Sequence, residues 1–189
     1  MGHSKRMTDD NNSHLEVQEA ELIKRAQSDP RDFADLYDLY AQRVFRYLLS
    51  KTGNQQDAED LTTQTFMAAL QSLPSYQHRG SFSAWLFSIA RNKTNDHFRK
   101  QHKQISLEEA EGDKVDWRNP GILRDQTLDL SKLISRLPED DQELLRLRFV
   151  AEMKFSEIAA LVKKSEDAVK KKIYRLLSWM ENQLEDNNV

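Results

Sequence analysis

The sequence predicts an all-α protein made of two small helical domains that a flexible linker joins. Apolar residues recur at three- and four-residue steps along most of the chain, which is the period of an amphipathic helix. Glycine and proline are scarce, at five and four of 189 residues, and strand-like alternation is scarce too. The helical period is lost between residues 105 and 126, where acids, glycine and proline follow one another. We therefore expect domains at 17–104 and 127–189, with 105–126 as the linker.

Composition argues against several classes of protein. The chain has no cysteine, so thiol chemistry is excluded, and a zinc site would need histidine and carboxylates alone. It has no run of about 18 apolar residues and no charged-then-apolar leader, which argues against a membrane span or a secretory signal and makes the cytoplasm the expected location. Residues 1–16 are polar and are expected to be disordered. We expect no metal and no cofactor.

Two helices are expected at the start of the N-terminal domain. The first covers residues 16–28, with Val17 among its inward positions, and ends before Pro30 because the residue that precedes a proline is pushed out of the helical region. The second keeps helical spacing over residues 33–50, and Gly53 then breaks the pattern.

A third helix is expected over residues 54–73, and its first turns carry Asp57, Glu59 and Asp60. Carboxylates near a helix N-terminus are stabilised by the helix dipole by roughly 0.3 to 1 kcal/mol each, which would explain these acids without any partner. The functional alternative is an acidic face, together with Gln64, that is offered to a basic partner.

The helix expected over residues 81–103 changes character halfway along. Its first half has one apolar stripe, whereas in its second half five basic residues oppose a single acid, Asp96. The amides of Asn92 and Asn95, with aromatic rings beside them, are groups of the kind that read unpaired bases. These groups make nucleic acid the first ligand class to test. The alternative is a surface helix with a solvated cationic end.

The C-terminal domain is expected to be helical and to end in a helix-turn-helix. The expected helices cover residues 127–137, 138–150, 155–162 and 166–184. The last two lie close together in sequence and the second is basic on its outer face, as in a unit that sets a recognition helix in the DNA major groove. Lys163 and Lys164 occupy the turn, where glycine would cost less if a left-handed backbone is needed. A plain helical hairpin with a solvated cationic face is the alternative.

Three segments, in this order, carry a resemblance to a known family. They are DAEDLTTQTFMAAL at 57–70, FSAWLFSIARNKTNDHFRK at 82–100, and EIAALVKKSEDAVKKKIYRLL at 157–177. Together they resemble the bacterial sigma factors of the extracytoplasmic-function (ECF) group, within the sigma-70 superfamily. The chain departs from the common pattern at the turn, where Lys163 and Lys164 stand in place of a glycine and an apolar residue, and at Ala168, where a threonine is frequent.

The resemblance implies a role in promoter-specific transcription initiation and assigns residues to it. The first domain of this family binds the clamp helices of the largest subunit of core RNA polymerase, and the matching positions are Asp57, Asp60, Gln64 and Phe66. The following loop and helix melt and read the minus-ten promoter element, and the matching positions are His78, Arg79, Ser81, Asn92, Asn95, Asp96, Arg99 and Lys100. The second domain reads the minus-thirty-five element, and the matching positions are Ser165, Glu166, Ala168, Lys170, Lys171, Tyr174 and Arg175.

The resemblance also implies a regulatory partner. Members of this group are usually held inactive by an anti-sigma factor that covers the polymerase- and DNA-binding faces, and a flexible linker would let the two domains repack around it. With a net charge of −3, the chain is expected to bind free DNA poorly, which suits a subunit whose DNA binding depends on a larger enzyme. No direct membrane insertion is expected.

Two other functions remain open from the sequence. A regulator that binds operator DNA through the helix-turn-helix, independently of core polymerase, would leave the polar cluster at residues 92–100 unexplained. An enzyme is disfavoured because His97 and His102 do not share a helix face, and no zinc-protease spacing, nucleophile elbow or glycine-rich phosphate loop occurs.

Overall fold

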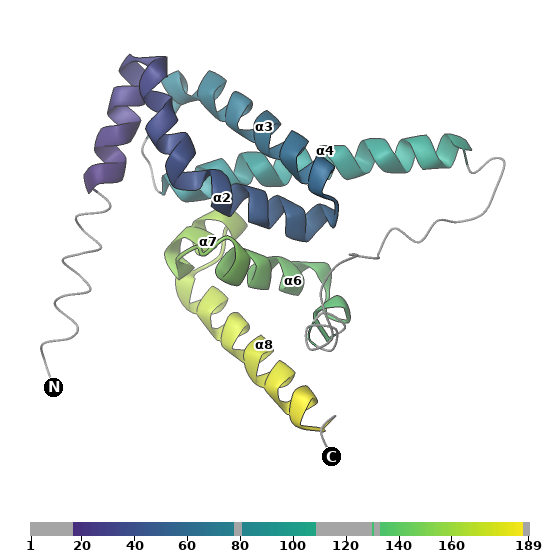
Figure 1. The fold of residues 1–189 in the computed structure, drawn as a ribbon. Coiled ribbons are helices and arrows are strands. Elements are labelled where there is room, and N and C mark those ends of the chain that lie inside the picture. The colour runs from purple at the N-terminus through teal and green to yellow at the C-terminus, as the bar shows by residue number, and fades with distance from the viewer. Residues whose placement is uncertain (1–16, 78–80, 109–129, 131–132, 187–189) are drawn as a thin grey trace, which may run out of the picture.

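The computed structural model describes residues 17–77, 81–108, 130 and 133–186, and every regular element within them is a helix (Figure 1). The prediction of an all-α protein is therefore confirmed. The elements are a first helix at 17–28, η1 (Pro30–Asp32), α2 (Phe33–Thr52), α3 (Gln55–Ser72), η2 (Leu73–Ser75), α4 (Phe82–Glu108), a short helical stretch at 133–135, α6 (Glu139–Leu145), η3 (Arg146–Val150), α7 (Phe155–Val162) and α8 (Glu166–Asp186).

Local chemistry explains where the first helices begin and end. The side chain of Asp29 accepts a hydrogen bond from the backbone N–H of Arg31, which starts the short η1 turn ahead of α2. Gly53 ends α2 in the left-handed conformation, at φ 65°, which glycine adopts without steric penalty. Asn54 then caps α3 by accepting from the N–H of Asp57. The chain therefore reverses between α2 and α3 and forms a helical hairpin.

The predicted boundary of the N-terminal domain differs from the observed helix. We expected the helix to stop near residue 103, but α4 continues to Glu108, inside the predicted linker. Residues 105–108 contain neither glycine nor proline, so nothing in them ends a helix that has already formed. The predicted disordered N-terminus at 1–16, and the predicted linker from 109 onward, lie outside the described residues.

The N-terminal unit consists of the first helix, α2, α3 and the first half of α4, packed around one apolar core. Its fully buried members include Leu36, Val44, Leu48 and Leu86. Val17 was expected to point inward and is 68% exposed, because at 3.6 residues per turn it lies on the side of the first helix opposite the buried Ala26.

The C-terminal unit contains the helix-turn-helix that the sequence predicts. After α6 the chain continues through η3 as a wider helical turn, in which the N–H of Ala151 donates to the carbonyl of Arg146 at 2.9 Å. The next helix, α7, has the predicted bounds, and α8 begins where predicted and continues past residue 184 to Asp186. Leu145, Leu176 and Met180 form a second, smaller apolar cluster along α8.

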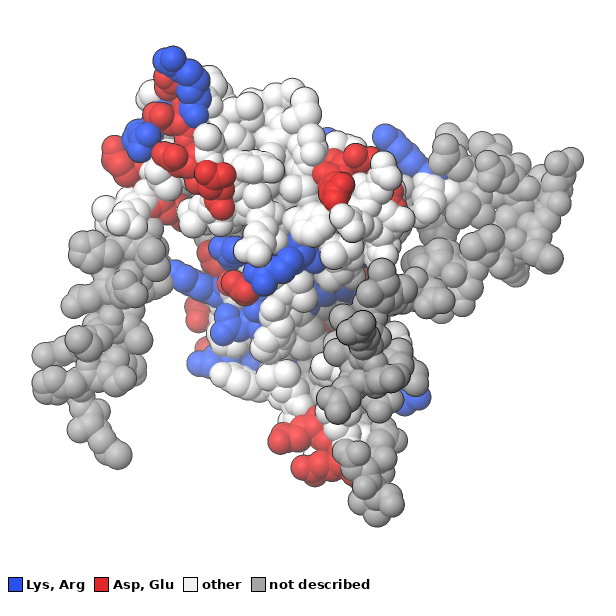
Figure 2. Space-filling model, viewed as in Figure 1, with Lys and Arg blue, Asp and Glu red and all other residues white. Residues whose placement is uncertain are grey.

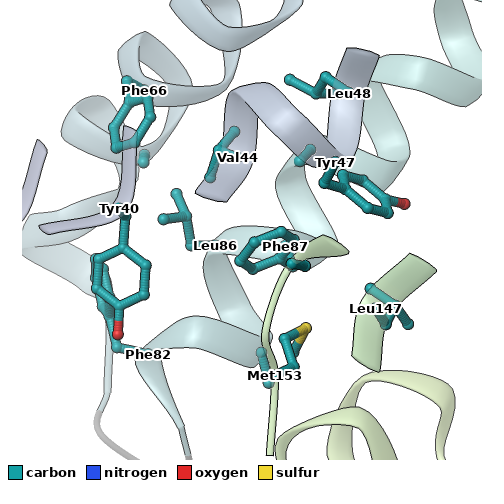
Figure 3. Close-up of a cluster of buried hydrophobic side chains, with 14 of the residues drawn as sticks. Tyr40, Val44, Tyr47, Leu48, Phe66, Phe82, Leu86, Phe87, Leu147 and Met153 are labelled. Carbon is teal, nitrogen blue, oxygen red and sulfur yellow. The ribbon is translucent and has the colours of Figure 1, made fainter. Parts of the chain in front are cut away.

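The two units do not stand apart, because they share the larger apolar core. Figure 3 shows Leu147 and Met153 of the C-terminal unit facing Tyr47 of α2 and Phe87 of α4. All four side chains are fully buried. The C-terminal unit therefore packs directly against α2 and α4 (Figure 1).

Candidate nucleic-acid interface

The start of α3 carries an acidic surface. Asp57, Asp60 and Gln64 are spaced so that they share one helix face. Asp60 and Gln64 are exposed, and Asp57 is half-buried with its carboxylate 3.6 Å from the Nε2 atom of His97 on α4. Figure 2 shows red atoms over these first turns of α3, with blue atoms of α4 beside them. This face can bind a basic partner without any change in the fold.

Phe66 does not belong to that surface. It is only 5% exposed, and its ring contacts the rings of Phe33 and Tyr37 at centroid distances of 6.3 and 4.7 Å. A ring packed in this way stabilises the α2–α3 hairpin and is not available to a partner. We therefore remove Phe66 from the candidate interface.

The second half of α4 carries a polar, exposed face. The predicted residues on it are Asn92, Asn95, Asp96, Arg99 and Lys100, all of them exposed. Thr94, on the opposite side of the helix, is fully buried and donates to the carbonyl of Ala90. Arg99 and Asp96 form an ion pair of 2.9 Å that is open to solvent. Because exposed ion pairs contribute little, this one can be exchanged for a contact with a nucleic-acid phosphate at small cost.

Ser81 lies at the N-terminus of α4 and connects the two units. Its Oγ atom accepts from the N–H of Ala84 at 3.4 Å and donates to the carboxylate of Glu157 in α7 at 2.9 Å. Ser81 is therefore tied to the C-terminal unit in this conformation. His78 and Arg79, which precede it in the predicted set, lie outside the described residues.

The outer face of α8 is open to solvent along its first three turns. Every predicted residue there is exposed, namely Ser165, Glu166, Ala168, Lys170, Lys171, Tyr174 and Arg175. The opposite face, which includes Val169 and Ile173, is buried. The helix thus separates a structural stripe from a cationic face, as a recognition helix requires.

Two contacts fix the position of that cationic face. The ring of Tyr174 lies 6.1 Å from the ring of Phe155 on α7, and the Nζ atom of Lys170 lies 6.0 Å from the same ring. The hydroxyl of Ser165 caps α8 by accepting from the N–H of Ala168. Ser165 therefore stabilises the helix whether or not it also contacts DNA.

The turn between α7 and α8 contains a left-handed backbone conformation, although no glycine is present to adopt it. Lys163 ends α7 in the left-handed region at φ 55°, a conformation that glycine adopts most easily. The expectation that a glycine would cost less at this turn is thus supported at Lys163. The turn nevertheless closes, with the N–H of Lys164 donating to the carbonyl of Ala159 at 3.0 Å.

Comparison with known proteins identifies the family. Residues 36–104 match the model for Sigma-70 region 2, and residues 127–180 match the model for Sigma-70, region 4. Over 144 residues the chain is 31% identical to the ECF RNA polymerase sigma factor SigM of Bacillus subtilis, across 75% of this chain and 88% of that protein. The chain belongs to the ECF RNA polymerase sigma factors.

Other relatives of this sigma factor agree. It is 35% identical over 176 residues to the ECF RNA polymerase sigma factor BldN of Streptomyces coelicolor, across 88% of this chain and 66% of that protein's length. It shares its fold with CnrH in complex with the cytosolic domain of CnrY, at a TM-score of 0.63 and 24% identity over 87% of this chain and 96% of that one. It also shares it with the sigma factor RpoE in complex with the anti-sigma factor NepR from Bartonella quintana, at a TM-score of 0.62 and 21% identity over 82% and 98% of the two chains.

One group of charged residues in this sigma factor escaped the sequence analysis. Glu143 of α6 is buried against Lys51 of α2 and Arg91 of α4. It follows a run of acids, a pattern that predicts an exposed helix N-terminus. Within the described ranges, no group of His, Asp and Glu is arranged to hold a metal ion, and no helix is both long and apolar enough to cross a bilayer.

Proposed function

We propose that this sigma factor binds core RNA polymerase, melts and reads the minus-ten element with α4, and binds the minus-thirty-five element with α8. Membership of the ECF family supports the overall role. The observation that carries the residue assignment is that α3, α4 and α8 each offer an exposed polar face opposite a buried one. This role requires no cofactor and no catalysis by the chain itself.

The proposed contact with core polymerase consists of Asp57, Asp60 and Gln64. Their face lies on a helix that the core holds rigidly through Ala58, Leu61 and other buried residues. Carboxylates held in place on one helix face can pair with a basic surface without first being ordered, which lowers the cost of association. The clamp helices of the largest polymerase subunit are the proposed partner.

The proposed contact with the minus-ten element lies on α4. Asn92 and Asn95 offer amides that both donate and accept, which suits the edges of bases that have left the duplex. Arg99 and Lys100 follow on the same side and offer cations to the backbone of the opened strand. His78, Arg79 and Ser81 remain proposed members of this site.

The proposed contact with the minus-thirty-five element lies on α8. Lys170, Lys171 and Arg175 supply cations, and Tyr174 supplies a ring with a hydroxyl. Ser165, Glu166 and Ala168 stand at the N-terminal end of the helix, which is the end that approaches base edges in other helix-turn-helix proteins.

We further propose that an anti-sigma factor controls this protein, by analogy with RpoE, whose structure contains the anti-sigma factor NepR. The proposed location is the cytoplasm, because core polymerase and promoters are found there. We also propose the division into an N-terminal domain at 17–104 and a C-terminal domain at 127–189, which the two family matches at 36–104 and 127–180 support.

A binding comparison tests the proposal against the independent regulator. Purified protein is mixed with a fluorescent promoter fragment, with and without core polymerase, at a fixed near-physiological salt concentration. The proposal expects weak binding to the duplex alone and stable, promoter-specific binding once core polymerase is added. Tight duplex binding that core polymerase does not change would support the regulator and contradict the proposal.

A further inference from the structure

We propose that the chain closes on itself without any inhibitor protein, through a buried latch centred on Glu143, and that this closed form is inactive. The latch consists of Tyr47 and Lys51 of α2, Arg91 of α4 and Glu143 of α6. The closure depends only on contacts within the chain. The claim that the closed form is inactive rests on the proposed function.

Glu143 is the centre of the latch because its partners come from the other unit. Its carboxylate accepts from the Tyr47 hydroxyl at 2.6 Å and from the Lys51 Nζ atom at 3.0 Å, and lies 3.7 Å from the Nε atom of Arg91. The side chains of Glu143 and Lys51 are 5% and 9% exposed. Within its own unit Glu143 has a contact to Arg146, at 4.0 Å. A buried carboxylate needs such partners, so Glu143 favours the state in which the units touch.

Further contacts between α2 and the C-terminal unit favour one particular arrangement of the two units. The guanidinium of Arg43 donates to the carbonyls of Ala151 and Glu152 at 2.9 and 3.3 Å, and Arg46 pairs with Glu152 at 2.8 Å. Figure 2 shows blue groups along this boundary, between α2 and the C-terminal unit. With the fully buried Met153 beneath them, these contacts combine an apolar centre with a charged border, which is the organisation of a specific interface.

Size explains why the closed form cannot act at a promoter. The minus-thirty-five and minus-ten elements are about 25 base pairs apart, or about 85 Å along B-form DNA. In the closed form α7 packs against both α4 and α8, and α4 itself is only about 40 Å long, so the two DNA-binding faces lie well short of that distance from each other. The stretch at 109–126 spans at most about 60 Å when extended, which is enough to separate the two units along DNA but only after the latch has opened. Simultaneous contact by α4 and α8 therefore requires the open form.

Energy transfer between two dyes tests the closure in the isolated full-length protein. The chain has no cysteine, so Gln56→Cys and Arg136→Cys introduce unique labelling sites. Both positions are exposed, and they flank the Lys51–Glu139 contact of 3.2 Å, so closure holds the dyes close together. Single molecules of the otherwise wild-type protein are expected in one high-transfer population without polymerase, DNA or inhibitor. A wild-type protein found mainly at low transfer would overturn the proposal.

Charge reversal tests the latch itself. Lys51→Glu and Glu143→Lys each replace an attraction with a repulsion from opposite sides of the boundary, and each is expected to lower the closed-to-open ratio at least about tenfold. The double variant restores opposite charges and should recover part of the high-transfer population. Glu181→Lys, an exposed reversal in the same unit, is the matched control and should stay closed. Circular dichroism checks that each variant folds. If one single variant does not fold, the other is enough to test the latch.

The outcomes separate the latch from the proposed function. Folded single variants that remain as closed as the control, or a double variant no more closed than either single one, would overturn the latch. Addition of core polymerase and promoter DNA in a second step should move the wild-type protein to low transfer. No movement in this step would contradict the inhibitory meaning of the closed form and the proposed function behind it, while the first step alone decides whether the chain closes.

Discussion

The hydroxyl of Tyr47 donates a 2.6 Å hydrogen bond to the carboxylate of Glu143, 96 residues further along the chain. This bond joins α2 to α6 in the protein interior, since both side chains are buried. Burial, and then the negative charge of Glu143, raises the pKa of Tyr47 well above its ordinary value. The neutral hydroxyl is therefore the form that the folded protein requires.

This relationship predicts a loss of stability in alkali. In the unfolded chain Tyr47 releases its proton near pH 10, whereas in the folded protein it keeps the proton to higher pH. The free energy of unfolding should therefore be unaffected by Tyr47 below about pH 10 and should fall above it, by up to about 1.4 kcal/mol per pH unit from this group. Tyr47→Phe should show a shallower fall between about pH 10 and pH 11.5, measured by urea unfolding. Equal slopes in both proteins would contradict the assignment.

The acidic face of α3 predicts a specific loss of polymerase binding. Asp60→Arg should weaken the affinity for core polymerase about tenfold or more, because the substitution puts like charges against a basic partner. Glu59→Arg is the matched control, since it reverses a charge on the same turn but on a different helix face. Fluorescence anisotropy with labelled protein measures both affinities. Equal losses for the two variants would show that overall charge matters and that the Asp60 face does not.

The polar face of α4 predicts a defect in promoter opening. Asn95→Ala with Arg99→Ala should reduce minus-ten melting about tenfold or more while leaving assembly with core polymerase nearly unchanged, because amide and guanidinium contacts to opened bases are lost. Permanganate footprinting of unpaired thymines measures the opening. Arg31→Ala removes an exposed arginine from a different element, η1, and serves as the control. An equal loss of melting and of assembly would argue against the role.

The outer face of α8 predicts a change in promoter preference. Lys171→Ala with Arg175→Ala should reduce the discrimination between an intact and a mutated minus-thirty-five element about tenfold. Arg136→Ala, which removes an exposed cation in the same unit, should leave that discrimination intact. Transcript yields from the two promoters give the ratio. An unaltered ratio in the double variant would remove α8 from the reading of this element.

The turn of the helix-turn-helix predicts a gain in stability. Lys163 holds a left-handed backbone at φ 55°, so Lys163→Gly should raise the free energy of unfolding by up to about 1 kcal/mol. The next residue, Lys164, does not have a positive φ, so Lys164→Gly should bring no gain in stability. Thermal unfolding of the three proteins provides the comparison. A gain at residue 164 and none at 163 would contradict this reading of the turn.

Features set by neighbouring residues could be predicted from the sequence. Gly53 ends α2, as expected, and Ser165 caps α8 in an equally local way, because each acts on backbone groups within a few residues of itself. The exposed faces of α3, α4 and α8 follow from helical period in the same way. Phe66 was placed at the interface by the resemblance alone, and that placement was wrong. A ring beside an acidic face can lie in a core or on an interface, and the contacts of Phe66 with Phe33 and Tyr37 place it in the core.

The packing of the two units could not be predicted in this way. Glu143 follows Glu139, Asp140 and Asp141, so its sequence environment is that of a solvated helix start. Its partners lie in α2 and α4, and no local pattern links segments so far apart in the chain. The composition of the linker indicated that the two domains can move relative to each other. Linker length sets how far the domains can separate, but it does not determine whether they bind each other.

Reconstituted transcription tests the central claim most directly. Purified core RNA polymerase is given a template with a promoter for this sigma factor, and the 5′ ends of the transcripts are mapped with and without the protein. The account predicts one defined start site downstream of the minus-ten element that appears only when the protein is present. The same start site with equal yield in its absence would contradict the account.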